Sequence, residues 1–239
     1  MMDNSLRPPE ALMCAIKQEL RPVKSSPRPL RLVLRMVPVA LLVSSLVLFL
    51  MGLRGDLYLV GPLLGWGASL IQFGLAIAFV WIAGHESQSV DRLPRLVIYS
   101  AIVGASVVVA LINLATFLRS PAGSALVRIP PAINELLRTS PWIMGFGCGI
   151  GSTVAGGILV LLFSWLFRNS LATRSTEAGA LYGGGAGLAI NSGWRIACPV
   201  STLWHSLGAH GAAIIATVIL GALIGRFLGR RRLYFRGRI

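Results

Sequence analysis

Cysteine and histidine side chains carry the most reactive chemistry in this sequence. Cys148 and Cys198 lie near the ends of two different apolar segments, and His205 follows Cys198. Two thiols at the same depth on an oxidising side of a membrane could form a disulfide or act as a thiol sensor. Together with His205 they could instead hold a soft metal ion, with Cys148 and Cys198 as the candidate metal ligands. The alternative is that both cysteines are small buried hydrophobes and that His205 lies at the membrane interface.

The composition places these residues in an integral membrane protein. Of the 239 residues, 55% are hydrophobic and only 13% are charged, whereas soluble domains have about 25% charged residues. That deficit excludes a disordered chain, a coiled coil and an ordinary cytosolic enzyme. The formal charge is +14, but the placement of the basic residues indicates a membrane topology rather than nucleic-acid binding.

Six apolar segments are long enough to cross a bilayer, for which a helix needs about 20 residues. We predict an all-α polytopic membrane protein with six transmembrane helices. The predicted spans are 32–53, 57–83, 96–118, 141–167, 177–197 and 207–228. The fifth span is the weakest, because Asn191, Ser192 and several glycines lower its hydropathy. The chain then has a cytoplasmic N-terminal segment (1–31), a six-helix transmembrane domain (32–228) and a basic cytoplasmic tail (229–239).

The distribution of basic residues predicts the orientation of these spans. With six spans and a cytoplasmic N-terminus, 16 Lys and Arg residues lie on the inner side and five on the outer side. The outer five include Arg54 and Arg195, and Arg35 lies just inside the first span. Because basic residues resist the translocation of short loops, this bias favours six spans with both termini cytoplasmic.

Tryptophans gather near both predicted membrane interfaces. Trp142, Trp194 and Trp204 fall near the outer one, and Trp81 and Trp165 near the inner one. Tryptophan is enriched at membrane–water interfaces because its ring is amphipathic. We therefore expect an aromatic belt here and no binding site.

Motifs of known catalytic chemistry are missing from the sequence. It contains no P-loop and no G-x-S-x-G, H-E-x-x-H or Cys-x-x-Cys motif. Ionisable residues near the bilayer midplane, which coupled transporters use, are almost absent. We expect neither an enzyme nor a bound cofactor. A channel or transporter, with the Gly-rich fifth span lining a pore, and a thiol-redox membrane protein are the alternative functions.

The N-terminal segment offers a separate docking surface. Residues 9–20 read as a short helix with Leu12, Ile16 and Leu20 on one face at four-residue spacing. A stripe of one or two turns cannot fold alone. It must lie on the membrane surface, pack on a span, or dock into a groove of a partner protein.

Glycines recur at every fourth position in the last two predicted spans. Gly179, Gly183 and Gly187 share one helix face, and Gly221 and Gly225 share another. Small residues at this spacing let two helix backbones approach closely. We expect these faces to pack against each other within the chain, and a homo-oligomer through the same Gly-x-x-x-Gly faces is the alternative.

In order and spacing, these features resemble the NrsF family of bacterial six-span membrane anti-sigma factors. The resemblance covers nearly the whole chain and rests on several short motifs. They are the short N-terminal helix followed by Glu19-Leu20-Arg21-Pro22-Val23; Gly52-Leu53-Arg54-Gly55-Asp56-Leu57 at the first outer turn; Cys148 early in the fourth span; and a terminal block with Gly179, Gly183 and Gly187, Cys198-Pro199, Trp204-His205 and Gly221 to Gly225.

The resemblance implies a regulatory function in the bacterial inner membrane. It implies that the protein sequesters an extracytoplasmic-function (ECF) sigma factor and releases it on envelope stress, without direct contact to nucleic acid. The N-terminal segment would hold the sigma factor, and the outward-facing Cys148 and Cys198 would take part in sensing stress, including metal stress. The candidate partner-binding residues are Leu12, Ile16, Leu20, Arg21 and Val23.

Overall fold

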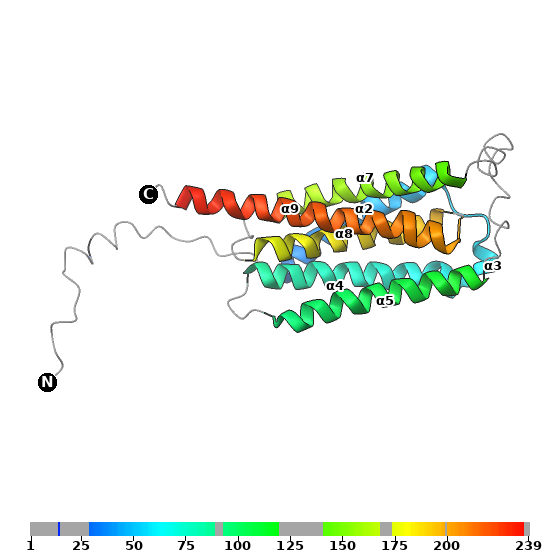
Figure 1. Cartoon of the computed structure of the whole chain (residues 1–239), viewed down its shortest axis with the longest axis horizontal. Helices are drawn as coiled ribbons and strands as arrows, with labels where there is room; N and C mark the ends of the chain where they lie inside the picture. The colour runs from blue at the N-terminus through cyan, green and yellow to red at the C-terminus, as the bar shows by residue number, and fades with distance from the viewer. Residues whose placement is uncertain are drawn as a thin grey trace.

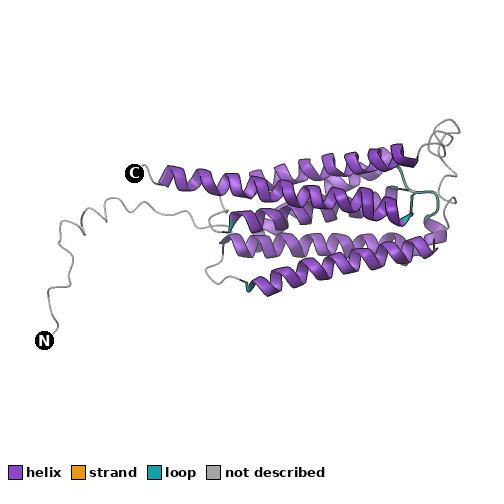
Figure 2. Cartoon of the chain, viewed as in Figure 1, coloured by secondary structure: helices purple, strands orange, loops and turns teal. Residues whose placement is uncertain are grey.

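The computed structural model of the chain is a bundle of helices (Figure 1). It describes residues 14, 29–88, 93–119, 141–167, 174–198 and 200–236, and these contain no β-strand (Figure 2). The long helices are α2 (Pro29–Met51), α4 (Ala68–Gln88), α5 (Arg95–Arg119), α7 (Pro141–Phe167), α8 (Ser175–Ala197) and α9 (Gly211–Arg236). Three short segments join them: α3 (Leu57–Pro62) and the π-helical turns η2 (Leu63–Gly67) and η4 (Trp204–His210). The predicted all-α class is confirmed.

Five segments of the described chain are long and apolar enough to cross a membrane. They are Leu30–Met51, Leu57–Ser87, Arg95–Arg119, Phe146–Leu166 and Trp204–Arg230. Their outward faces are apolar, and Leu42 and Phe49 of α2, for example, are 71% and 85% exposed. Continuous apolar faces of this kind belong in hydrocarbon rather than in water. The chain is therefore a multi-pass membrane protein, whereas the number of spans and the side on which its ends lie stay predictions.

The remaining long helix, α8, lies at the centre of the bundle. From Leu181 to Ala197 its residues are buried, apart from the half-buried Arg195. It packs against α9, α4, α2 and α7 (Figure 1). This position explains the low hydropathy that made it the weakest predicted span: small residues let four helices approach, and little of α8 is left to face lipid.

The glycine faces of α8 and α9 lie against each other. A Cβ atom on Gly179 would collide with the carbonyl oxygen of Gly221, and one on Gly183 with that of Thr217. Likewise, a Cβ atom on Gly225 would collide with the carbonyl oxygen of Ser175. The predicted packing of these faces within the chain is confirmed, and a homo-oligomer through them stays a prediction.

The long helices alternate in direction along the chain. The start of α2 and the end of α9 lie at one end of the bundle (Figure 1). The opposite end, at which α2, α5 and α8 finish, is called the distal end below. It carries the connections from α2 to α3 and from α8 to η4.

The second predicted span is interrupted near the distal end. Gly61 has φ of 82°, a left-handed conformation that glycine adopts without a Cβ clash. Pro62 follows, and the chain then makes the π-helical turn η2 before α4 begins. The wider turn of η2 lets the carbonyl oxygen of Leu64 accept a hydrogen bond from Nε of Arg195 at 3.5 Å.

Replacing Gly183 with alanine tests the contact between α8 and α9. We expect Gly183→Ala to lower the free energy of unfolding by about 1–3 kcal/mol, because the added methyl group meets rigid backbone rather than a flexible side chain. The measurement is the midpoint of thermal unfolding of the full-length protein in detergent. Gly104→Ala is the matched control, since a Cβ atom there would meet nothing within 4 Å. Equal midpoints for the two variants would show that the glycine faces do not meet.

Candidate metal- and thiol-binding site

The structure brings the two predicted sensor cysteines together. Cys148 lies in α7, and Cys198 follows directly after the end of α8. Their Sγ atoms are 3.8 Å apart, and both side chains are buried free thiols. α8 packs against α7, and this contact places the two residues side by side although they are far apart in sequence. A small movement would bring the sulfur atoms to bonding distance.

His205 belongs to the same site. Its Nε2 atom lies 3.2 Å from Sγ of Cys198, and its side chain is buried. Its backbone N–H donates to the hydroxyl of Thr202 at 3.4 Å, which helps fix the start of η4. His205 is therefore packed inside the protein against Cys198, and a sensing role for it stays a prediction.

A fourth candidate ligand, His210, was not predicted from the sequence. One ligand atom from each of Cys148, Cys198, His205 and His210 lies within 4.8 Å of the others, and all four residues are buried. We call these four residues the Cys–His cluster. Ser152 Oγ lies 3.2 Å from Nδ1 of His210, and the two imidazole rings meet edge to face with centroids 5.0 Å apart.

The π-helical turn η4 explains why both histidines reach the cluster. On an α-helix, residues five apart point about 140° away from each other, given 3.6 residues per turn. A π-helical turn bonds residue i to residue i+5 and so brings such residues to one side. His205 and His210 are five apart and both lie in η4. A search for α-helical periodicity therefore does not detect this five-residue spacing.

The cluster has the ligands of a small metal site. Two thiolates and two imidazoles are a common ligand set for tetrahedral Zn²⁺, and thiolates also favour Cu⁺ and other soft ions. Without a metal ion, the adjacent thiols can form a disulfide. Metal binding and oxidation would therefore compete for the same two sulfur atoms.

The surroundings of Cys198 favour its thiolate form. The residue lies in the connection after α8, outside the helices. Hydrogen bonding with Cys148 is the largest cause that holds the pKa of the Cys198 thiol well below its ordinary value. Hydrogen bonds with His205 and His210 and the charge of His210 lower this pKa further, whereas burial opposes the shift. A thiol of low pKa is the better nucleophile and metal ligand at neutral pH.

The third cysteine, which was not a predicted site residue, lies away from the cluster, and the remaining predicted site residues lie outside the described residues. Cys14 is exposed and takes no part in it. The candidate partner-binding residues all lie outside the described residues, so their role stays a prediction: they are Leu12, Ile16, Leu20, Arg21 and Val23.

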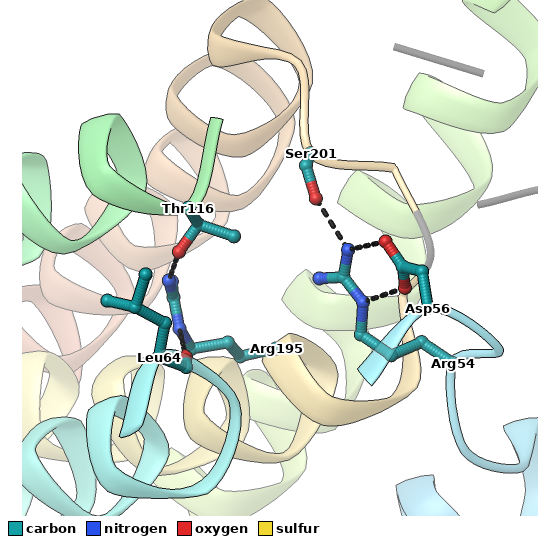
Figure 3. A network of polar contacts seen from close by, with 6 residues as sticks. All are labelled: Arg54, Asp56, Leu64, Thr116, Arg195 and Ser201. Carbon is teal, nitrogen blue, oxygen red and sulfur yellow. Dashed lines mark hydrogen bonds and ion pairs between the residues drawn. The ribbon is translucent and has the colours of Figure 1, made fainter. Parts of the chain in front are cut away.

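A polar network lies beside the cluster at the distal end (Figure 3). Nε and Nη2 of Arg54 donate to Oδ1 and Oδ2 of Asp56 at 2.6 and 2.7 Å, and Nη2 also donates to Ser201 Oγ at 2.6 Å. Arg195 donates to Asn113, Thr116 and two backbone carbonyls. From the sequence, Arg195 was predicted only as a charge that orients the spans, and Arg54 also as part of the motif at the first outer turn. The short Arg-x-Asp spacing was the one local signal of an ion pair.

Trp194 also differs from its expected role. It was predicted to lie in an interfacial belt, but it is only 6% exposed, and its ring centroid lies 5.9 Å from that of His210. Trp165 and Trp204, at 61% and 72% exposure, are as accessible as a belt requires. Trp194 is thus packed inside the protein, beside His210 of the cluster.

Comparisons with known proteins gave no match. No family model, curated protein or solved structure matches the chain. The resemblance to the NrsF family, which rests on short motifs, therefore stays a prediction. The chemistry of the Cys–His cluster rests on its own geometry.

Metal binding by the purified full-length protein tests the cluster. We expect one Zn²⁺ or Cd²⁺ ion per chain, with the largest loss of affinity in Cys198→Ser, because Cys198 contacts both Cys148 and His205. His210→Gln should weaken binding by at least about tenfold, since even an indirect partner of a metal ligand is worth that much. Competition with a chelator measures each affinity.

The third histidine of the chain supplies the matched control. His85 lies in α4 and is not part of the cluster. His85→Gln and Cys14→Ser should keep wild-type affinity. If His85→Gln and His210→Gln bound metal equally well, His210 would not be a ligand.

Proposed function

We propose that this chain is a membrane-bound anti-sigma factor that detects thiol-reactive or soft-metal stress through the Cys–His cluster. It holds an ECF sigma factor through its N-terminal segment and releases it when the state of the cluster changes. The buried cluster, with four ligand atoms within 4.8 Å of one another, is the observation that carries the proposal. The resemblance to the NrsF family supports the identity of the partner.

The proposal includes six spans, with both termini in the cytoplasm of a bacterium and the chain in its inner membrane. The bias of 16 inner to five outer basic residues supports this topology. The alternating helix directions, with the start of α2 and the end of α9 at one end of the bundle, are compatible with it (Figure 1). α8 can be the remaining span despite its low hydropathy, because its neighbours rather than lipid surround it. The distal end and its cluster then face the outside.

A change in the cluster must reach the cytoplasmic side to release a partner. The cluster joins α7 to the end of α8 and the start of η4, so oxidation or metal binding constrains these elements together. Before the start of α8, Arg174 Nη1 lies 3.2 Å from Oε2 of the buried Glu86 at the end of α4. The cluster has two states, with and without a disulfide or bound metal, and each would favour its own helix arrangement. Release follows if one arrangement binds the sigma factor more weakly than the other.

Substitutions in the N-terminal stripe test how the partner is held. Replacing Leu12, Ile16 and Leu20 together with Asp should release the sigma factor without stress, because carboxylates are costly to bury in a groove. A transcriptional reporter for the sigma factor, in cells that express the full-length protein, measures the release. Membrane fractionation verifies insertion.

A second triple variant controls for the added charge. Ala11, Ala15 and Gln18 lie on another face of the predicted helix, and their replacement with Asp should leave repression intact. Full repression by the variant of Leu12, Ile16 and Leu20 would show that the partner is held elsewhere.

Serine substitutions of the cysteines test sensing in the same reporter cells. Cys148→Ser and Cys198→Ser should each abolish induction by oxidants and soft metals, because either change removes the disulfide and one metal ligand. The double variant should behave like either single one, since the two thiols act as a unit. Cys14→Ser should respond as the wild type does. Wild-type induction in both single variants would assign these thiols to packing and end the sensing proposal.

A further inference from the structure

A small polar cavity lies beside the Cys–His cluster at the distal end. Its volume is ≈ 30 Å³, which exceeds the about 10–15 Å³ that a cavity needs to hold one group of the size of water. Cys198 and His210 contribute to its wall, as do Arg54 and Arg195. The described residues that line it include no carboxylate.

Arg54 presents an unused donor at this cavity. Its Nε and Nη2 atoms are occupied by Asp56 and Ser201. Its Nη1 atom has no hydrogen-bond partner within the described part of the chain, and Figure 3 shows it pointing away from Asp56 toward the side of Arg195. The ion pair thus holds the guanidinium rigidly and leaves one edge open to the cavity.

Arg195 brings a positive charge that is not neutralised. It donates from Nη1 to Asn113 Oδ1 at 2.7 Å, from Nη2 to the carbonyl oxygen of Ile112 at 3.1 Å and to Thr116 Oγ1, and from Nε to Leu64. All of these acceptors are neutral, and no carboxylate of the described ranges lies within ion-pair distance. A buried cation is costly unless an opposite charge is near. With Arg54 paired to Asp56, Arg195 is the guanidinium of the cavity wall that has no carboxylate partner among the described residues.

Trp194 adds a second unused donor. It lines the cavity and is only 6% exposed. Its indole Nε1 is buried and makes no hydrogen bond with any described residue. Buried indole N–H groups nearly always have a partner. Because Trp194 lines the cavity, we look for that partner there.

We propose that this cavity binds a small inorganic anion between Arg54 and Arg195, beside the Trp194 indole. The two guanidinium groups favour an anion at their side of the cavity, and the polar wall does not suit an apolar ligand. Halide ions and small oxyanions share the chemistry that these donors recognise. The site goes beyond the proposed function because it needs no partner protein, and it shares Cys198 and His210 with the Cys–His cluster.

Anion titration of the purified full-length protein tests the site. The midpoint of thermal unfolding is followed while chloride or sulfate replaces gluconate at constant ionic strength, gluconate being too large for the cavity. In the wild type we expect the midpoint to rise and then level off as the site fills. Saturation by chloride alone would identify a halide site, and saturation by sulfate would identify an oxyanion site. Both outcomes support the proposal.

Two variants locate the response. Arg195→Gln should raise the half-saturating anion concentration by at least about tenfold, because losing a hydrogen bond to a charged group weakens binding by about that factor. Trp194→Phe should weaken binding similarly while it retains every charge, and it carries the test if Arg195→Gln does not fold. Arg35→Gln, at an exposed arginine of α2, is the control and should titrate as the wild type does. The proposal would be overturned if the wild-type midpoint were the same in all three salts. It would also be overturned if the wild type, Arg195→Gln and Trp194→Phe gave identical titrations. The cavity would then hold only water.

Discussion

The contact on which this structure depends is the close packing of α8 inside the bundle, backbone against backbone. Glycines of α8 face several neighbours: Gly179 and Gly183 meet α9, Gly184 and Gly185 meet Phe79 and Val80 of α4, and Gly193 meets Ser44 of α2. Ser44 Oγ also donates to the carbonyl oxygen of Ala189 at 2.9 Å, which ties α2 to α8 by a hydrogen bond. In a bilayer, where burial against lipid gives little driving force, such short contacts and interhelical hydrogen bonds hold helices together. A side chain larger than glycine at these positions would push the neighbouring helices away from α8.

The polar chemistry gathers at the distal end because α8 ends there. Within a few residues its last turn supplies Trp194, Arg195 and Cys198, and its neighbours hold each of them in place. Arg195 reaches across to Asn113 and Thr116 of α5, which keeps a charged group inside the bundle rather than at the lipid face. Cys198 meets Cys148 of α7 because α7 packs on α8. The Cys–His cluster and the neighbouring cavity are thus two consequences of one helix end.

The sequence predicted the long helices well, because each is an apolar run bounded by charges, Pro or Gly. It also identified Cys148, Cys198 and His205, since free thiols in a membrane protein are few and His205 is near one of them in the chain. It could not reveal His210, because the five-residue spacing requires a π-helical turn that no simple pattern announces. Nor could it distinguish Trp194 from an interfacial tryptophan, or Arg54 and Arg195 from solvated loop charges. Those distinctions depend on which helix faces inward, and the apolar faces of a membrane protein look alike whether they meet lipid or protein.

A different arginine holds each end of α8 to its neighbours. These contacts suggest how a chemical change at one end can affect the other end. Arg195 holds the distal end to α5, and Arg174 holds the opposite end to Glu86, a fully buried carboxylate that also accepts a hydrogen bond from the backbone N–H of Leu93 at 2.8 Å. Between them the glycine contacts bring the backbone of α8 close to that of α9, which limits how far the two helices can shift past each other. Packed helices of this kind move as units over about 1–2 Å rather than deforming locally. A change at the Cys–His cluster that displaces the end of α8 would therefore also alter the contact between Arg174 and Glu86. Because Glu86 accepts a hydrogen bond from Leu93, the connection between α4 and α5 would change with it. A loosely packed helix would not transmit such a displacement.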